Sequence, residues 1–264
     1  MATTINTKQI HYALRIAAAM CFIGHGAFGI ITKEIWCNYF AVFGIGHNMA
    51  YTLMPWLGSV DILMGLSLIF YPTAAITAWL VIWGMLTASC RPLSGEPFAE
   101  FIERAGNYGA PLALLILSGL FQKNIKGVFS KLDPNVNPDE TTMQQVITCL
   151  RIVVFLLLAG HGWLNVIEKK SLIAQYTSLG FSNAATTAHI VGIFEFIAAV
   201  IVLVRPIRPV LFTFFIWKMG TELFYPHWEL FEWVERAGSY GAILALWFCT
   251  KKITIPAANY KTAY

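Results

Sequence analysis

Two histidines flanked by glycines mark the places where this chain could do chemistry. His25 and His161 each stand in a Gly-His-Gly triplet, and each is followed by an acid within an apolar stretch, Asp61 or Glu195. Histidine exchanges protons near neutral pH, and a carboxylate beside it can orient the ring or accept the proton. The flanking glycines let a neighbouring helix or a flat ligand approach closely. We therefore predict catalytic roles for these four residues.

A glutamate–arginine pair recurs in the same way. Residues 103–110 read ERAGNYGA and residues 235–242 read ERAGSYGA, with seven of the eight residues identical. A charged side chain at the centre of a membrane costs about 2.5–3.5 kcal/mol, so an acid there needs a partner. Two interpretations remain open. The arginines neutralise the acids of the histidine–acid pairs in a buried network, or a pocket exists in which a ligand is held by Glu103, Arg104, Glu235 and Arg236.

Further matches indicate a tandem duplication. The tripeptide Leu-Arg-Ile occurs at 14–16 and again at 150–152, and Trp83 matches Trp217 at nearly the same offset. Order and spacing agree along the chain, as expected for an internal repeat. The predicted boundaries are a first repeat at 1–122, a linker at 123–144 and a second repeat at 145–264.

The composition indicates a membrane protein. The chain has 264 residues, of which 57% are hydrophobic and 12% are charged, whereas soluble domains carry about 25% charged residues. Its apolar runs are roughly 17–22 residues long, which suits a membrane span. We predict an all-α polytopic membrane protein with eight transmembrane helices, arranged as two four-helix bundles. The expected helices lie near 10–31, 53–71, 73–91, 104–121, 145–167, 187–204, 208–225 and 236–251.

The predicted topology places the chemistry near one face of the membrane. Four crossings return the chain to its starting side, so the two repeats have the same orientation. Loop lysines and arginines number nine on one side and six on the other, which favours cytoplasmic termini. At 1.5 Å per residue, His25 lies ~9 Å and Asp61 ~12 Å below the outer face. The histidine, the acid and the glutamate–arginine pair are then expected to converge within each repeat.

Several kinds of site are disfavoured by the sequence. The five cysteines form no CxxC pair, so neither a zinc site nor a disulfide framework is predicted. The basic residues form no block of the kind that binds nucleic acid. A haem held between His25 and His161 stays open as a lesser alternative, because the neighbouring acids are unusual for a haem pocket.

Short motifs in both repeats resemble the DoxX-like membrane family. The resemblance rests on Leu-Arg-Ile followed by an apolar run and a lysine (Lys33 or Lys169), on Gly192-x-x-Glu195 followed by Arg205, and on the late Glu-Arg-Ala-Gly-x-Tyr-Gly motif. The family consists of four-helix membrane units and includes subunits of thiosulfate:quinone oxidoreductase. The resemblance implies a redox role near the quinone pool, at the outer face of the bacterial cytoplasmic membrane.

The expected function is therefore that of a quinone-linked redox subunit, with membrane lipids, quinone and other membrane subunits as partners. One alternative is a non-enzymatic assembly or structural subunit of a large membrane complex. Another is a small-solute transporter, since parallel repeats also occur in transporters. A structural subunit should keep its polar cluster sealed and fully paired, whereas an enzyme subunit should leave the cluster accessible.

Overall fold

A computed structural model describes residues 6–119, 125–225 and 230–250. Within these ranges the chain is helical, and its sole β-type pairing is an isolated bridge between Thr73 and Lys131. A helix occupies each of the eight expected ranges: α1 (Thr7–Ile30), α3 (His47–Phe70), α4 (Ala74–Leu93), α6 (Ala105–Leu117), α7 (Glu140–Val166), α9 (Ala184–Val204), α10 (Arg208–Leu223) and α12 (Ala237–Cys249). Shorter elements stand between them: α2 (Trp36–Ala41), α5 (Ala99–Glu103), η2 (Ile125–Phe129), α8 (Lys170–Ser178) and α11 (Leu230–Glu235).

Five of the described helices are long and apolar enough to cross a membrane, namely α1, α3, α4, α7 and α9. The helices α6 and α12 have 13 residues each and α10 has 16, whereas about 20 residues cross the hydrocarbon core. The apolar helices indicate a membrane protein. By length and composition the structure supports five candidate spans rather than the eight that the sequence predicts.

Local sequence signals explain where several helices begin. The side chains of Asn6, Thr73, Asp139 and Asn183 each accept a hydrogen bond from the backbone N–H three residues further on. Such N-caps satisfy one of the free donors in the first helical turn. They fix the first residues of α1, α4, α7 and α9.

The arginine of each Leu-Arg-Ile motif binds the end of a neighbouring helix. Arg15 donates from Nε to the carbonyl of Leu68 at 2.6 Å, and Arg151 donates to the carbonyl of Val204 at 2.9 Å. These carbonyls lie in the last turns of α3 and α9, where no partner exists within the helix. The motif therefore anchors the first helix of each half to the second.

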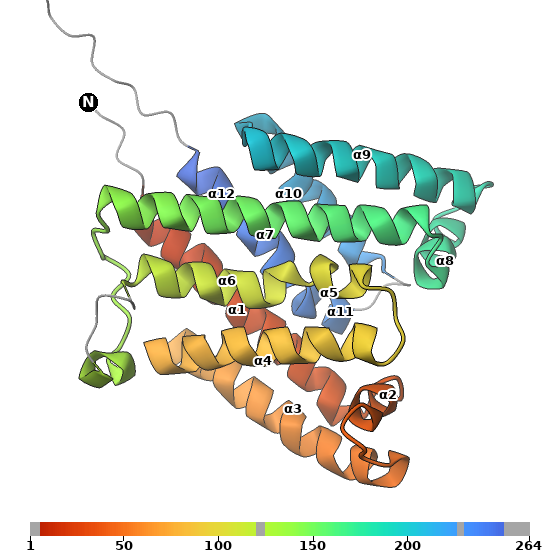
Figure 1. Cartoon of the computed structure of the whole chain (residues 1–264), viewed down its shortest axis with the longest axis horizontal. Helices are drawn as coiled ribbons and strands as arrows, with labels where there is room; N and C mark the ends of the chain where they lie inside the picture. Colours follow the sequence, from red (N-terminus) through yellow and green to blue (C-terminus); the bar gives the residue numbers. More distant parts are fainter. Residues whose placement is uncertain (1–5, 120–124, 226–229, 251–264) are drawn as a thin grey trace, which may run out of the picture.

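The helices run along the long axis of the molecule, and α1 begins at the same end at which α12 ends (Figure 1). The short helices α2, α5, α8 and α11 lie at the opposite end. At the end where α1 begins, the predicted linker packs against the first half through Leu132. Leu132 is 1% exposed and donates its N–H to the carbonyl of Pro72 at 2.8 Å.

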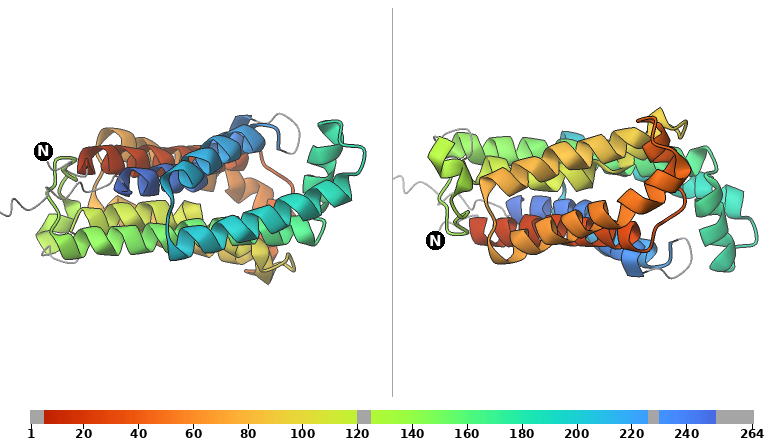
Figure 2. Two further views of the ribbon diagram at one scale, coloured as in Figure 1. Left: turned by 90° about the horizontal axis from the view of Figure 1, so that it is seen from above. Right: turned by 90° about the horizontal axis from the view of Figure 1, so that it is seen from below.

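The two halves interlock. The first helix of each half packs on the fourth helix of the other, so that α1 lies against α12 and α7 lies against α6. Figure 2 shows α1 with α12 in one layer and α6 with α7 in the next. The repeat boundaries at 122/123 and 144/145 stay predictions, and residues 120–124 and 251–264 lie outside the described part of the chain. In space, however, the halves are not separate packing units.

The glycines of the Gly-His-Gly triplets make this interlocking possible. A Cβ atom at Gly24 would lie 2.4 Å from the backbone nitrogen of Glu235, and one at Gly160 would lie 2.4 Å from that of Glu103. Real Cβ atoms do not approach so closely. Each glycine therefore lets the glutamate–arginine segment of the other half rest directly on the helix backbone.

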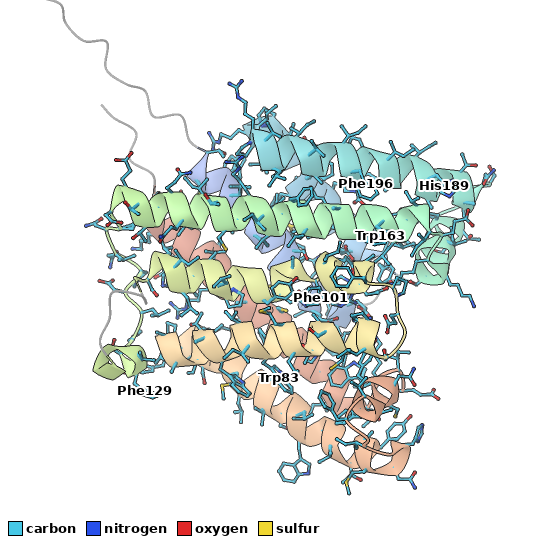
Figure 3. All side chains as sticks on the ribbon, in the orientation of Figure 1. Trp83, Phe101, Phe129, Trp163, His189 and Phe196 are labelled. Atoms are coloured by element: carbon cyan, nitrogen blue, oxygen red, sulfur yellow. The ribbon has the colours of Figure 1, made fainter. Side chains whose placement is uncertain are left out.

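The outer surface is apolar, as expected for contact with lipid. The candidate spans of α1 and α7 are 56% buried, whereas those of α3 and α9 are 28% and 33% buried. Exposed side chains include Leu63 and Phe70 on α3, and Trp163 and Phe196, which are labelled in Figure 3. Accordingly, α1 and α7 form the centre of the assembly and α3 and α9 its outer faces.

Candidate functional site

His25 and Asp61 form a direct contact between α1 and α3. The His25 Nδ1 atom lies 2.7 Å from Oδ2 of Asp61, and Asp61 is 1% exposed. The helices can approach because a Cβ at Gly58 would lie 2.4 Å from the carbonyl oxygen of Gly26. The acid thus fixes one ring nitrogen of the histidine and leaves Nε2 for another partner.

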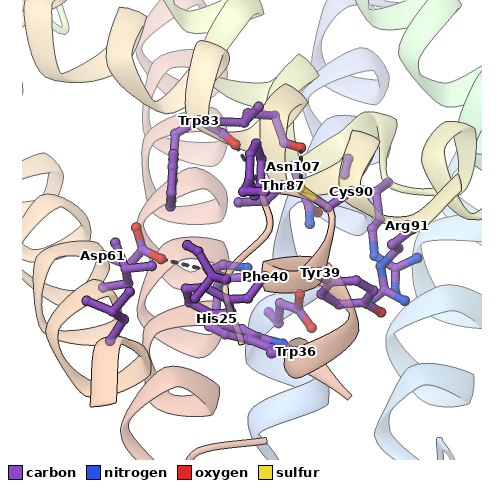
Figure 4. Close-up of a pocket in the computed structure, with 18 of the residues that line it drawn as sticks. His25, Trp36, Tyr39, Phe40, Asp61, Trp83, Thr87, Cys90, Arg91 and Asn107 are labelled. Carbon is purple, nitrogen blue, oxygen red and sulfur yellow. Dashed lines mark hydrogen bonds and ion pairs between the residues drawn. The ribbon is translucent and has the colours of Figure 1, made fainter. Parts of the chain in front are cut away.

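A cavity of about 310 Å³ opens beside this pair (Figure 4). Its walls come from α1, α2, α3 and α4, with further contributions from α6, α11 and the arginine between α5 and α6. The polar side chains at the cavity include His25, Asp61, Arg91, Arg104 and Glu235. The aromatic side chains are Trp36, Tyr39, Phe40, Phe43, Trp56 and Trp83. A mostly apolar cavity with a few converging polar groups is the usual form of a small-molecule site.

The short helix α2 covers one side of the cavity and is held there by polar contacts. The Tyr39 hydroxyl donates to Oε1 of Glu96 at 2.5 Å, and Arg91 donates to the other oxygen of Glu96 at 3.0 Å. Burial raises the pKa of Tyr39, so its hydroxyl stays protonated as a donor. Trp36 lies with its ring centroid 4.5 Å from that of His25. These wall residues belong to no repeated motif and were not predicted from the sequence.

Glu235 is the acid of the glutamate–arginine motif that reaches this cavity, although it comes from the second half of the chain. It is 6% exposed, and within the described residues it makes neither a hydrogen bond nor an ion pair shorter than 4.0 Å. Glu235 and the positively charged Arg104 line the same cavity. The Glu235 side chain therefore presents an oxygen acceptor to the cavity.

The second half repeats the histidine–acid contact in a closed setting. The His161 Nδ1 atom lies 2.5 Å from Oε2 of Glu195 and 3.1 Å from the amide nitrogen of Asn165. The amide oxygen of Asn165 accepts a hydrogen bond from Tyr176 at 2.6 Å. His161 is 7% exposed and Glu195 is fully buried. The surroundings of His161 are thus filled by hydrogen-bonding side chains.

Buried ion pairs complete the second site. Lys218 Nζ lies 2.7 Å from Oε1 of Glu222, and Arg236 Nε lies 3.2 Å from the other oxygen of Glu222. Glu103 lies 2.7 Å from Arg236 and 2.8 Å from Arg104. Lys218 therefore pairs with Glu222, which lies one helical turn further along α10.

The sequence predicts that the histidine, the acid and the glutamate–arginine pair of one half lie together, and this prediction is wrong for the glutamate. Arg104 does line the cavity of His25 and Asp61, but the acid there is Glu235, while Glu103 lies with His161. The cause is the packing of each fourth helix on the first helix of the other half. The arginines also pair with other glutamates rather than with Asp61 and Glu195.

Two further ion pairs join the halves, and neither was predicted from the sequence. Lys169 Nζ lies 2.6 Å from Oε1 of Glu100, and Lys33 pairs with Glu232. Both lysines follow the first helix of a half, and both glutamates stand three residues before the repeated glutamate–arginine pair. The corresponding positions of these residues in the two halves are the sequence feature from which both ion pairs could have been predicted.

The group Glu103, His161 and Glu222 has the composition of a metal site, since its ligand atoms lie within 4.8 Å of one another. Both carboxylates are already neutralised by Arg236, and Glu222 also by Lys218. A divalent cation there would face these positive charges directly. The geometry therefore favours a charge network over a metal centre. A haem shared by the two histidines gains no support either, because His161 does not line the cavity of His25.

Comparison of the chain with protein-family models, with curated proteins and with solved structures finds no match.

Proposed function

We propose that this chain is an integral membrane subunit of a quinone-linked redox system, with its quinone-binding site in the first half. The observation that carries the proposal is the 310 Å³ cavity, in which a histidine–carboxylate pair and an arginine face aromatic walls. A quinone head group is a flat ring with carbonyl oxygens at its edge. It needs aromatic contact, hydrogen-bond donors and a proton-exchanging group, all of which this cavity provides.

The proposal includes the membrane arrangement expected from the sequence. We propose eight crossings by α1, α3, α4, α6, α7, α9, α10 and α12, as two repeats of the same orientation with both termini in the bacterial cytoplasm. In support, α5 directly precedes α6 and α11 directly precedes α12, so that each pair together lengthens a short span. The DoxX-like resemblance fits the same arrangement.

The chemistry of the site follows from its geometry. Quinones carry two electrons and two protons between redox proteins, and a partner subunit would supply or accept the electrons. His25 is held through Nδ1 by Asp61, so its Nε2 can exchange a proton with a ligand oxygen. Arg104 would stabilise negative charge on that oxygen. Trp36, Phe40 and Trp83 supply the stacking surfaces.

A purely structural role is favoured for the second half alone. There the polar cluster is buried and its charged side chains lie beside opposite charges, as expected of an anchor, although the Oε1 atom of Glu195 has no hydrogen-bond partner in the described part of the chain. The cluster of the first half borders an open cavity. The two halves would then have diverged after duplication, one keeping a ligand site and the other a stabilising network.

The proposal is tested by titrating the purified chain with a short-chain benzoquinone and following tryptophan fluorescence. Wild type should bind one equivalent, and His25→Ala should weaken binding roughly tenfold, as expected for loss of one charged hydrogen-bonding group. His189→Ala is the control, because His189 is half-exposed and pairs only with Glu168 among the described residues. Equal binding by wild type and His25→Ala, or no binding at all, would contradict the proposal.

A further inference from the structure

In the second half, a side chain of the chain itself fills the space beside His161. Ala88 lines the first-half cavity, and at the offset that matches Trp83 to Trp217 its counterpart is Glu222. The Glu222 side chain is 3% exposed, and its carboxylate lies within 4.8 Å of the ligand atoms of His161 and Glu103. A carboxylate therefore stands beside the histidine where the first half has a methyl group and an open cavity.

The arginine that binds this carboxylate has a counterpart with free donors. Arg236 donates from Nη1 to Glu103, and its Nε atom lies 3.2 Å from Glu222 as an ion pair. In its counterpart Arg104, the hydrogen bonds within the described residues all leave from Nη1, toward Glu100 and Glu103. Since Arg104 also lines the cavity, its Nε and Nη2 atoms remain for a ligand.

Each site contains a second positively charged side chain, but the two do not stand at corresponding positions of the repeats. In the second half it is Lys218, 2.7 Å from Glu222. In the first half the corresponding residue is Gly84, and Arg91 lines the cavity instead, at the position matched by Tyr225. Both sites thus bring an arginine and a second cation near a histidine. In the first half the two cations, Arg104 and Arg91, share the Glu100 carboxylate at 2.7 and 3.4 Å. Glu100 is the counterpart of Glu232, so the first half has no acceptor at the position that Glu222 occupies in the second half.

We infer that the first-half cavity binds its ligand through an oxygen acceptor, a ring carbonyl or a carboxylate, at the place that the Glu222 carboxylate holds in the second half. This inference rests on the proposed function, because a quinone carbonyl is such an acceptor. Glu235 stays available for a hydroxyl on the same ligand. In the second half the Glu222 carboxylate already fills the corresponding place, so each chain binds one ligand.

The test introduces an oxygen acceptor into the cavity by a substitution at Ala88. In Ala88→Glu a carboxylate can reach Arg104, whereas in the matched control Ala88→Met a side chain of similar length fills the space without an acceptor. Ala88→Glu should melt about 2 °C or more above Ala88→Met, since a shift of this size corresponds to a single new interaction in a chain of this length. Both variants should bind the short-chain benzoquinone at least about tenfold more weakly than wild type, because the added side chain occupies the site.

Each outcome decides a different point. A melting temperature of Ala88→Glu at or below that of Ala88→Met would overturn the inference, whatever happens to benzoquinone. Benzoate, titrated into wild type in parallel, separates a carboxylate ligand from a ring carbonyl. If benzoate binds and benzoquinone does not, the proposed function fails and the inference stands. If neither binds, both fail.

A reciprocal variant covers the case in which Ala88→Glu does not fold. Glu222→Ala leaves Arg236 and Lys218 without their shared carboxylate. Acetate should then raise the melting temperature of Glu222→Ala by about 2 °C or more relative to chloride at equal ionic strength, and it should not do so for wild type. Absence of this rescue would show that the cluster is not an acceptor site and would overturn the inference.

Discussion

Arg236 Nη1 lies 2.7 Å from Oε1 of Glu103, and this contact joins the two halves of the chain. The two residues are 9% and 5% exposed. Glu103 is at the same time 2.8 Å from Arg104, so one carboxylate receives the arginines of both repeated motifs. The contact ties the fourth helices of the two halves together at the end of the molecule where both histidine–acid pairs are found.

Removal of this arginine should destabilise the whole molecule. Arg236→Ala leaves Glu103 and Glu222 short of a buried partner, which costs roughly 3–5 kcal/mol. Thermal unfolding in detergent should show a large loss of melting temperature and folded yield. Arg205→Ala serves as the control, because Arg205 is exposed at the end of α9, and it should melt like wild type. Similar melting of the two variants would show that the Arg236–Glu103 contact contributes little.

A methyl group on Gly24 should disrupt the interlocking of the halves. In Gly24→Ala the new Cβ would lie 2.4 Å from backbone atoms of Glu235, so α1 and α11 must move apart. Folded yield and melting temperature should both fall. Gly46→Ala is the matched control, since a Cβ at Gly46 meets nothing within 4 Å. If both variants fold and melt like wild type, α11 does not pack against α1 at Gly24, and the account is contradicted.

The two histidines should respond differently to truncation. His161→Ala leaves the buried Glu195 without its 2.5 Å partner, at a cost of about 1–3 kcal/mol or more for the unsatisfied charge. His25→Ala should cost less stability, because water can enter the adjoining cavity and solvate Asp61. Melting temperatures of the two variants, measured side by side, check this. A larger loss for His25→Ala would contradict the assignment of the open site to the first half.

The membrane topology yields a prediction of its own. Reporter fusions after Lys126 and after Lys252 should both report the cytoplasm, and a fusion after Lys33 should report the opposite side. Residue 252 lies outside the described part of the chain, so the fusion also places the C-terminal end. A periplasmic signal after Lys126 or Lys252 would disprove the arrangement of eight crossings with equally oriented repeats.

Much of the helical plan and the histidine–acid pairing could be predicted from the sequence. The apolar runs located the eight main helices, because long apolar segments in a membrane protein are helical. The repetition of His25 with Asp61 and of His161 with Glu195 predicted that each histidine meets an acid, and both contacts are present. Their role in catalysis stays a prediction.

The exchange of the fourth helices could not be predicted. The segments beginning at Glu103 and Glu235 are nearly identical, so either one offers the same glycines and charges to α1 or α7. The sequence therefore does not favour one pairing over the other. The second site is closed by several side chains together, among them Asn165, Tyr176 and Glu222, whose neighbours become known only when the helices are packed.

The most direct test of the account is photoaffinity labelling of the purified chain with an azido-benzoquinone, followed by peptide mapping. The account predicts labelling of residues 36–40 and 83–91, which border the cavity, with loss of the label when unmodified benzoquinone is added in excess. It predicts that the corresponding segments of the second half, 172–176 and 217–225, stay unlabelled. Label spread evenly over both halves, or label that excess benzoquinone does not displace, would contradict a quinone site in the first half.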